Sequence, residues 1–268
     1  MKRIAIITGA AGGIGSATAQ CLGEKGYALM LTDIDPVKLT SVGDELQKNG
    51  ITVELCPGDL SDPQFWDVLV DQSFKTFGRV DVLVNNAAWR IGMSIRKTTL
   101  EIWEKTLRVC LTAPTFLAKS VADIMEKQTS GGVIVNISSV MAERPSGLAP
   151  AYIAAKGALN SLTKELSITY GRKGIRVVGI APGYIDTELS NDYTDPDGDN
   201  ISDMLIQQLT DFIPLGRGGQ AAEIARSIAW ICSEEASYLT GTTLNLDGGL
   251  LTNFNSYSAK KRQFPDEF

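Results

Sequence analysis

The chain has 268 residues, of which 25 are Lys or Arg and 31 are Asp or Glu, so its formal net charge is −6. With 44% hydrophobic and 21% charged residues it has the profile of an ordinary globular protein, and it lacks the excess of basic residues that nucleic-acid-binding proteins use to neutralise phosphates. It contains no histidine. This excludes His-dependent hydrolase triads, His-ligated metal sites and a histidine general base.

The predicted elements alternate between strand and helix through residues 1–250. Short apolar, β-branched runs predict strands at 4–8, 27–32, 51–56, 80–84, 133–138, 175–181 and 242–246. Segments with helical periodicity predict helices at 13–25, 36–49, 62–77, 101–128, 150–173 and 220–233. Such alternation favours an α/β fold in which a single domain forms a doubly wound parallel sheet of about seven strands with helices on both faces.

Two segments depart from this alternation. Residues 186–219 form a long polar stretch, and we predict that its part at about 188–213 acts as a substrate lid. Residues 251–268 form a polar C-terminal tail, which we expect to provide surface or subunit contacts.

The spacing of the cysteines and the lengths of the apolar runs indicate the cellular compartment. The four cysteines are scattered, without the CxxC pairs of zinc or thiol-redox motifs, so we predict no metal site and free thiols. The apolar run 4–7 is shorter than a signal-peptide core, and no apolar stretch approaches about 18 residues. We therefore expect a cytoplasmic protein.

A glycine-rich turn follows the first strand and reads Thr8-Gly9-Ala10-Ala11-Gly12-Gly13-Ile14-Gly15. Glycines at a strand-to-helix turn let the backbone approach a pyrophosphate, which the N–H groups and positive dipole end of the helix then bind. The alternative for a glycine cluster alone is a plain tight turn. Its place between the first strand and the first helix favours a dinucleotide site on a Rossmann-like fold.

Asp33 ends the second strand, where a carboxylate hydrogen-bonds the adenosine ribose hydroxyls. It also repels a 2′-phosphate, because at about 4 Å and an effective dielectric near 20 each pair of like charges costs about 4 kcal/mol. No Lys or Arg occurs in 9–15 or 33–37 to offset that charge. The sequence therefore predicts NAD rather than NADP as cofactor, the alternative for Asp33 being a solvated turn acid.

Tyr152 and Lys156 stand four residues apart on the predicted helix that follows strand 133–138. This spacing places the phenol and the ammonium on one helix face. A neighbouring cation favours the phenolate, which allows a tyrosine to accept and return a proton near neutral pH. A serine at the end of the preceding strand could hold the reacting oxygen. Tyr-x-x-x-Lys pairs also arise by chance in many helices, so the rest of the pattern must support this assignment.

The chemistry-bearing residues follow one another in a characteristic order. They are the turn 8–15, Asp33, Asn85-Asn86-Ala87, Ser139, Tyr152 and Lys156, accompanied by Asp59-Leu60, Pro182-Gly183 and Leu246-Asp247-Gly248-Gly249. Taken together, residues 3–250 strongly resemble the short-chain dehydrogenase/reductase family. The resemblance implies an NAD-binding domain over residues 1–250 that transfers hydride between a nicotinamide and a secondary alcohol or ketone.

The resemblance also implies residue roles. It makes Tyr152 the general acid/base, Lys156 its electrostatic partner and a ligand of the nicotinamide ribose, and Ser139 the residue that orients the substrate oxygen; Ser138 is structural. The implied cofactor-binding residues are Gly9, Gly13, Ile14, Gly15, Asp33, Asp59, Leu60, Asn86, Ala87, Tyr152, Lys156, Pro182, Gly183, Ile185 and Thr187.

Two positions depart from the family pattern. Ala88 replaces a glycine, which the backbone tolerates if its φ is negative. Cys110 replaces an asparagine that in the family holds a helix kink and a water linked to the lysine. Because a thiol is a weak donor and a weak acceptor, we expect a weakened proton relay.

The substrate is less well specified. Family position places Trp89, Arg90, Met141 and Tyr184 near it, and the leading hypothesis is NAD-dependent oxidation of a sugar, sugar acid or polyol. The alternatives are NADH-dependent reduction of a small ketone and a catalytically weakened dinucleotide sensor. The resemblance further implies a small-molecule substrate, no nucleic-acid or membrane partner, and a homotetramer assembled through helices 101–128 and 150–173.

Overall fold

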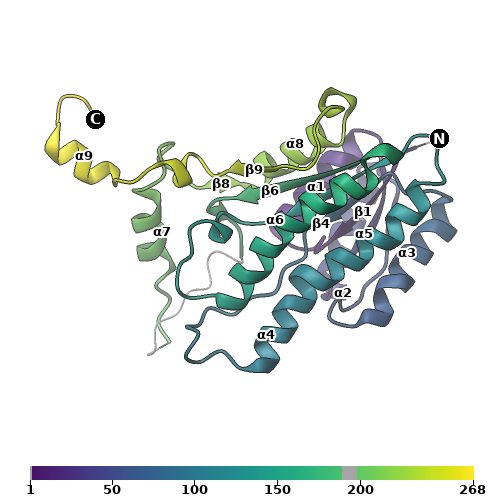
Figure 1. Ribbon diagram of the computed structural model, residues 1–268, viewed down its shortest axis with the longest axis horizontal. Helices are drawn as coiled ribbons and strands as arrows, with labels where there is room; N and C mark the ends of the chain where they lie inside the picture. Colours follow the sequence, from purple (N-terminus) through teal and green to yellow (C-terminus); the bar gives the residue numbers. More distant parts are fainter. Residues whose placement is uncertain (1, 189–197) are drawn as a thin grey trace.

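The computed structural model describes residues 2–188 and 198–268, and its centre is a seven-stranded parallel sheet in the order β3-β2-β1-β4-β5-β6-β9 (Figure 1). The strands are β1 (Ile4–Thr8), β2 (Ala28–Thr32), β3 (Val53–Leu55), β4 (Val82–Asn85), β5 (Gly132–Ile137), β6 (Ile175–Pro182) and β9 (Thr243–Leu246). The helices that alternate with them are α1 (Gly13–Glu24), α2 (Pro36–Lys48), α3 (Pro63–Phe77), α4 (Leu100–Leu107), α5 (Ala113–Met125), α6 (Pro150–Tyr170) and α8 (Ala221–Ile231). The predicted single-domain, doubly wound fold is confirmed.

Helices cover both faces of the sheet, which explains why its strands read as continuous apolar runs. In β1 all five residues are buried, and successive side chains point to opposite faces. Ala5 and Ile7 join the core built with α1, α2 and α8, whereas Ile6 joins the core built with α3 and α5. In Figure 1, α3, α5 and α6 lie in front of the sheet and α1 and α2 lie behind it.

The strand order reverses between β1 and β4, which are neighbours although two strands separate them in sequence. In doubly wound sheets this reversal opens a crevice at the carboxyl ends of the strands, and ligands bind there. The glycine-rich turn follows β1 and Asn86 follows β4, so both lie at this crevice.

The predicted helix 101–128 is interrupted, which corrects the expectation of one continuous element. A π-helical turn, Arg108–Thr112, separates α4 from α5. Pro114 has no N–H group, so the regular bond to the carbonyl of Cys110 cannot form. The turn widens instead, and the N–H of Ala113 donates to Arg108 O.

Helices also occur where the sequence suggested irregular structure. Helix α7 (Ser202–Thr210) lies in the predicted lid, of which residues 189–197 are outside the described part of the chain, and the two-stranded ribbon of β7 (Ile185–Asp186) and β8 (Gly219–Gln220) flanks that region. Helix α9 (Tyr257–Gln263) lies in the tail and projects away from the body of the molecule (Figure 1).

Asp211, just after α7, binds the C-terminal tail (residues 251–268, the C-terminal arm) through hydrogen bonds. The backbone N–H of Tyr257 donates to Asp211 O at 2.7 Å, and both the N–H and the hydroxyl of Ser258 donate to Asp211 Oδ1 at 2.9 Å. The backbone N–H of Ser258 is the main reason that the pKa of Asp211 lies below its usual value. The tail is therefore tied to the end of α7.

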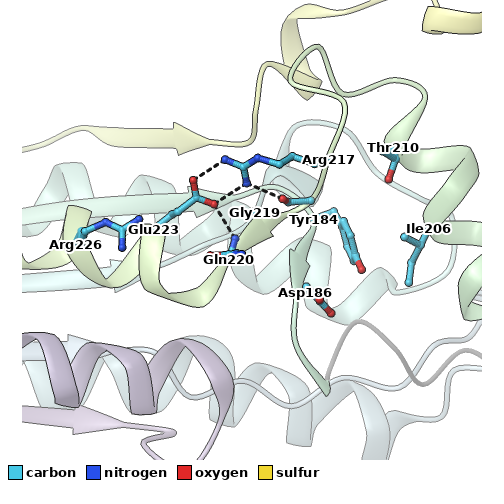
Figure 2. Close-up of a pocket in the computed structure, with 10 residues that line it drawn as sticks. Tyr184, Asp186, Ile206, Thr210, Arg217, Gly219, Gln220, Glu223 and Arg226 are labelled. Atoms are coloured by element: carbon cyan, nitrogen blue, oxygen red, sulfur yellow. Dashed lines mark hydrogen bonds and ion pairs between the residues drawn. The ribbon is translucent and has the colours of Figure 1, made fainter.

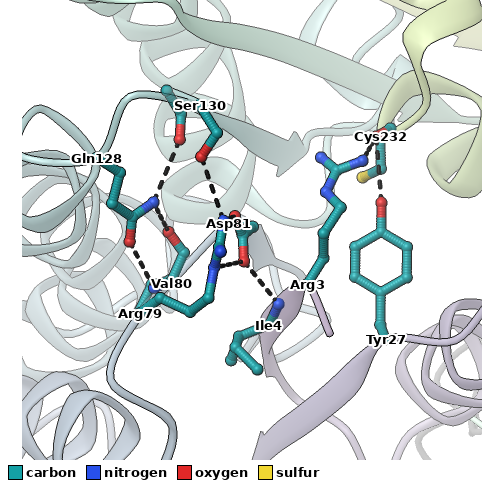
Figure 3. Close-up of polar contacts among 10 residues, drawn as sticks. Arg3, Ile4, Tyr27, Arg79, Val80, Asp81, Gln128, Ser130 and Cys232 are labelled. Carbon is teal, nitrogen blue, oxygen red and sulfur yellow. Dashed lines mark hydrogen bonds and ion pairs between the residues drawn. The ribbon is translucent and has the colours of Figure 1, made fainter. Parts of the chain in front are cut away.

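A polar cluster joins the amino-terminal edge of the sheet (Figure 3). Asp81 is 2% exposed, and its carboxylate accepts from Ile4 N at 2.8 Å and from Arg79 Nε at 2.8 Å and Nη2 at 2.5 Å. Nearby, the carbonyl of Cys232 at the end of α8 accepts from Arg3 and from the hydroxyl of Tyr27. These contacts connect β1 to the segment before β4 and to α8.

The described residues offer neither a candidate membrane span nor a candidate metal site. No helix within 2–188 or 198–268 is long and apolar enough to cross a membrane. The same residues contain no group of three or more metal-ligating side chains that could hold an ion.

Candidate active site

Asn86 fixes the glycine-rich turn from the neighbouring strand end. Its side-chain Nδ2 donates to Thr8 O at 2.9 Å and to Gly9 O at 3.0 Å. In return, the hydroxyl of Thr8 accepts from the backbone N–H groups of Asn86 and Ala87, both at 3.0 Å. A Cβ on Gly15 would lie 2.0 Å from Gly9 O, so this turn can close only around glycine. The two strand ends thus form one rigid unit.

The first turn of α1 is open to an anionic ligand. Gly12 and Gly13 are exposed, and no side chain caps the helix. Free N–H groups at an uncapped helix start, together with the helix dipole, suit a phosphate group. Thr187 closes this end of the crevice, since a Cβ on Gly13 would lie 2.6 Å from Thr187 Cγ2. The residues present therefore fit the pyrophosphate of a dinucleotide.

Asp33 lies directly beside this turn. Its Oδ2 accepts from Ala11 N at 3.0 Å, and its Oδ1 accepts from Asp35 N at 3.1 Å. The carboxylate is therefore held at the glycine-rich turn and retains lone pairs for a further donor.

The remaining predicted cofactor residues are placed less uniformly. Asp59 accepts from Ser61 N at 2.7 Å, as in an Asx turn, and Leu60 is buried. The side chain of Ile185 packs in the core, so a contact of this residue with a carboxamide must come from its backbone. Gly183, after Pro182 of β6, packs against Asp247, where a Cβ would lie 2.7 Å from Asp247 Cα.

Ser139, Tyr152 and Lys156 meet where β5 ends and α6 begins. Tyr152 is 8% exposed, and Lys156 Nζ lies 5.4 Å from the centroid of its ring. The hydroxyl of Ser139 accepts from Met141 N at 3.2 Å and begins the short helical turn Val140–Ala142. Ser138 instead donates its hydroxyl proton to Lys156 O, so its side chain supports the scaffold.

Lys156 is the most unusual side chain of this group. It is 1% exposed, and its ammonium donates to Ile137 O at 2.6 Å. Within the described residues no carboxylate forms an ion pair with it. Burying an unpaired ammonium is costly, and such charges persist mainly where the site uses them.

Cys110 lies in the π-helical turn beneath this group and is fully buried. Its Sγ accepts from Trp89 N at 3.4 Å and donates to Trp89 O at 3.5 Å. The thiol thus contacts both backbone groups of Trp89. The weakened proton relay expected for a thiol at this position stays a prediction. Ala88 has a negative φ, as its replacement of glycine requires.

We expect Cys110→Ala to lower the free energy of unfolding by about 0.5–1 kcal/mol more than Cys56→Ala, because only the former also breaks two hydrogen bonds. Cys56 is the matched control, since it is buried and its thiol forms no hydrogen bond with the described residues 2–188 and 198–268. Urea unfolding followed by circular dichroism measures the difference. Equal losses in the two variants would contradict a role for the Trp89 contacts.

The predicted substrate residues fall into two places. Trp89 and Met141 pack around Tyr152, and Arg90 borders a narrow depression that includes Tyr152. Lys105 lies over the ring of Trp89, with Nζ 4.9 Å from the ring centroid. Tyr184 instead lines a separate cavity of about 460 Å³ between the β7–β8 ribbon and α7 (Figure 2). The Ser139, Tyr152 and Lys156 side chains do not line that cavity.

Sequence reasoning missed the ion pair at the rim of this cavity. Arg217 and Glu223 form two parallel contacts of 2.8 Å, and Gln220 N donates to Glu223 Oε2 at 2.9 Å (Figure 2). The hydrogen bond from Arg217 is the largest of the influences that lower the pKa of Glu223 to about 2. The Gln-x-x-Glu spacing of a capping box at the start of the predicted helix 220–233 could have indicated the contact of Gln220 with Glu223, but it carries no signal for Arg217.

Known proteins resemble this chain over nearly its whole length. The family model described as enoyl-(acyl carrier protein) reductase matches residues 9–251. Glucose 1-dehydrogenase 2 of Bacillus subtilis (strain 168) is 33% identical over 250 residues, covering 92% of this chain and 94% of that protein.

Solved structures show the same similarity in three dimensions. The acetoin dehydrogenase YohF from Salmonella typhimurium superposes with a TM-score of 0.84 at 34% identity, covering 96% of this chain and all of the other. A Serratia marcescens short-chain dehydrogenase/reductase double mutant superposes with a TM-score of 0.83 at 30% identity, covering 92% and 97% of the two chains. With its parallel sheet, glycine-rich turn and Tyr-x-x-x-Lys helix, this chain belongs to the short-chain dehydrogenase/reductase family of oxidoreductases.

Proposed function

We propose that this oxidoreductase is an NAD-dependent dehydrogenase that oxidises a secondary alcohol, with a sugar, sugar acid or polyol as the substrate class. The observation that carries the proposal is the buried ammonium of Lys156 beside the ring of Tyr152. A cation with no carboxylate partner among the described residues stabilises the negative charge that develops on a phenol when it loses its proton.

In this proposal each catalytic residue handles one part of the proton transfer. Ser139 Oγ hydrogen-bonds the substrate hydroxyl and orients it toward Tyr152. Tyr152 Oη, as phenolate, accepts the hydroxyl proton, and Lys156 Nζ holds the phenolate charge in a site that excludes water. A bound nicotinamide supplies the hydride acceptor. The open N–H groups at the start of α1, together with Asn86, Asp33 and Thr187, form the binding residues of the dinucleotide.

The preference for NAD rests on Asp33. Its carboxylate is fixed beside the glycine-rich turn by Ala11 N, where it can accept from the adenosine ribose and where it repels a 2′-phosphate. Lys38 is the nearest following cation in the sequence.

We expect Asp33→Asn to weaken NADH binding by about three- to tenfold and to strengthen NADPH binding by about tenfold, because one ribose acceptor and one repulsive charge are lost. Fluorescence titration of both reduced cofactors measures the two dissociation constants. Asp44→Asn, which removes an exposed acid from the middle of α2, serves as the control and should leave their ratio unchanged. A wild-type protein that binds NADPH as tightly as NADH would contradict the Asp33 assignment.

The substrate class is supported by the names of the relatives and by the chemistry of the site. A glucose dehydrogenase and an acetoin dehydrogenase are among the similar proteins, and both names denote hydroxyl-bearing substrates. The deciding experiment follows NADH formation at 340 nm with NAD⁺ or NADP⁺ against aldoses, sugar acids, polyols and simple secondary alcohols, acetoin included. Turnover of one group with NAD⁺ supports the proposal. Turnover with NADP⁺ alone contradicts the assignment of NAD as cofactor. If no compound of the panel is oxidised, the proposed substrate class is contradicted.

Two alternatives to alcohol oxidation are ketone reduction by NADH and dinucleotide sensing. Reduction of a small ketone by NADH uses the same residues in the reverse direction, and NADH consumption tests it. The sensor hypothesis is motivated by the thiol of Cys110, which contacts the backbone of Trp89. Tight NADH binding without turnover of any substrate would favour it, and a large rise in rate in Cys110→Asn would show that the thiol weakens the proton relay.

We further propose that residues 1–250 act as one NAD-binding unit with α7 in the substrate lid and that the chain forms a homotetramer through α4, α5 and α6. Apolar side chains exposed on two of these helices support the assembly: Phe116 is 45% exposed on α5 and Ile168 is 78% exposed on α6. Sedimentation analysis tests it.

A further inference from the structure

An exposed ion pair spans the mouth of the dinucleotide crevice. Lys38 Nζ on α2 lies 2.8 Å from Glu188 Oε2, although the two residues are 150 positions apart in sequence. Glu188 directly follows Thr187, beyond β7. The side chains are 54% and 90% exposed, respectively, so solvent ions and ligands can reach both.

The two members of this ion pair belong to segments on either side of the glycine-rich turn. On one side, Lys38 lies in the first turn of α2, where its backbone N–H donates to Asp35 Oδ1. Two residues before Asp35 stands Asp33, whose carboxylate accepts from Ala11 N in the glycine-rich turn. On the other side, Thr187 lies against Gly13 at the start of α1. The ion pair therefore connects α2, which follows Asp33, with the segment after β7 that contains Thr187.

Charge around Lys38 is predominantly negative. The hydrogen bond to Glu188 is the main reason that the pKa of Lys38 is raised, and the charges of Asp35 and Asp33 add to it. The ammonium thus belongs to a residue in the first turn of α2, the helix that begins three residues after Asp33. A cation near the end of the second strand is what a 2′-phosphate requires in dinucleotide sites.

We propose that Glu188 is a cofactor-specificity residue, which pairs with Lys38 and so withholds from a 2′-phosphate the first cation that follows Asp33 in the sequence. This inference rests on the proposed function, since it requires that the dinucleotide binds at the glycine-rich turn with its adenosine ribose at Asp33. Discrimination then has two parts: Asp33 repels the 2′-phosphate, and Glu188 neutralises the side chain that would attract it.

The size of the effect follows from the exposure of the pair. Exposed ion pairs change equilibrium constants by up to about fivefold, and interactions between exposed charges weaken as salt is added. In the proposal Glu188 acts by engaging Lys38, so the gain on its removal comes from the released ammonium. We therefore expect Glu188→Gln to lower the dissociation constant for NADPH by about three- to fivefold at low ionic strength.

A double-mutant cycle with NADH and NADPH as probes tests the proposal without any substrate. Each reduced cofactor is titrated by fluorescence into wild type, E188Q, K38Q and E188Q/K38Q. We expect E188Q to strengthen NADPH binding while NADH binding stays within twofold of wild type. The single variant K38Q should bind NADPH as wild type does, and adding K38Q to E188Q should abolish the gain. Salt near 0.5 M should also reduce it.

Other outcomes overturn the proposal. A gain that survives in E188Q/K38Q would mean that Glu188 acts by simple repulsion and not through Lys38. Equal weakening of both cofactors in E188Q would make the pair a clasp that retains any dinucleotide. The matched control is E126Q, which breaks the exposed pair between Glu126 and Lys173 and should change neither constant. If wild type binds neither cofactor, the proposed function itself fails; if it binds NADH but the cycle shows no coupling, only this inference fails.

Discussion

Tyr152→Phe should reduce kcat for the substrate identified by the NADH-formation screen by about 10³-fold while leaving NADH binding within about twofold of wild type. The variant keeps the ring that packs with Val109, Cys110 and Ala155, but it removes the hydroxyl that accepts and returns the proton. Acid–base groups of this kind contribute about 10²–10⁴-fold to a rate. Initial rates at 340 nm and a fluorescence titration measure the two quantities.

The control for this change is Tyr170→Phe, at the last position of the same helix. Burial is the largest influence on the Tyr170 hydroxyl and raises its pKa, and Tyr170 does not border the Ser139, Tyr152 and Lys156 cluster. Its removal should leave kcat unchanged. Retention of more than a tenth of the wild-type rate by the Tyr152 variant would show that another group carries the proton, and the proposed roles of Ser139 and Lys156 would fall with it.

Asp81→Ala should produce the largest loss of stability among the changes considered, about 3 kcal/mol. The buried carboxylate accepts from Ile4 N and from two nitrogens of Arg79, so its removal leaves a buried backbone donor and a half-buried guanidinium without their partner. The urea midpoint of unfolding measures the loss. Asp123→Ala on the exposed side of α5 is the control and should change stability by less than about 0.5 kcal/mol. A loss below about 1 kcal/mol at Asp81 would contradict the structural role of the cluster.

The sheet was predictable because its signal is local. Strand β1 falls on the predicted residues 4–8, and α2 begins at Pro36 after its Asp35 cap, as the sequence indicates. The π-helical turn was not predictable from periodicity, because the apolar pattern continues through 108–112 and only Pro114 hints at the missing hydrogen bond. Helices α7 and α9 were missed because polar residues dominate both segments and tertiary contacts such as Asp211 with Ser258 hold α9.

The candidate site divides along the same line. Tyr152 and Lys156 are close in sequence, so their meeting on one helix face could be predicted. The Asp33 carboxylate was placed by its strand end, and the structure adds its contact with Ala11. The pairing of Lys38 with Glu188 could not be predicted, since no local pattern links residues 150 positions apart. The contacts of Cys110 with Trp89 depend on how the π-helical turn packs against the segment after β4, which requires atomic positions.

The C-terminal arm has a practical consequence for how this protein is handled. Asp211 joins α9 to the end of α7, and Ile206 and Thr210 of α7 line the 460 Å³ cavity, so α9 is tied to a helix that forms part of the cavity wall. An affinity tag or a surface-immobilisation anchor at the C-terminus would be attached just beyond α9 and its contacts with Asp211. The first described residues lie at the opposite end of the molecule in Figure 1, so purification handles and biosensor linkers belong at the N-terminus.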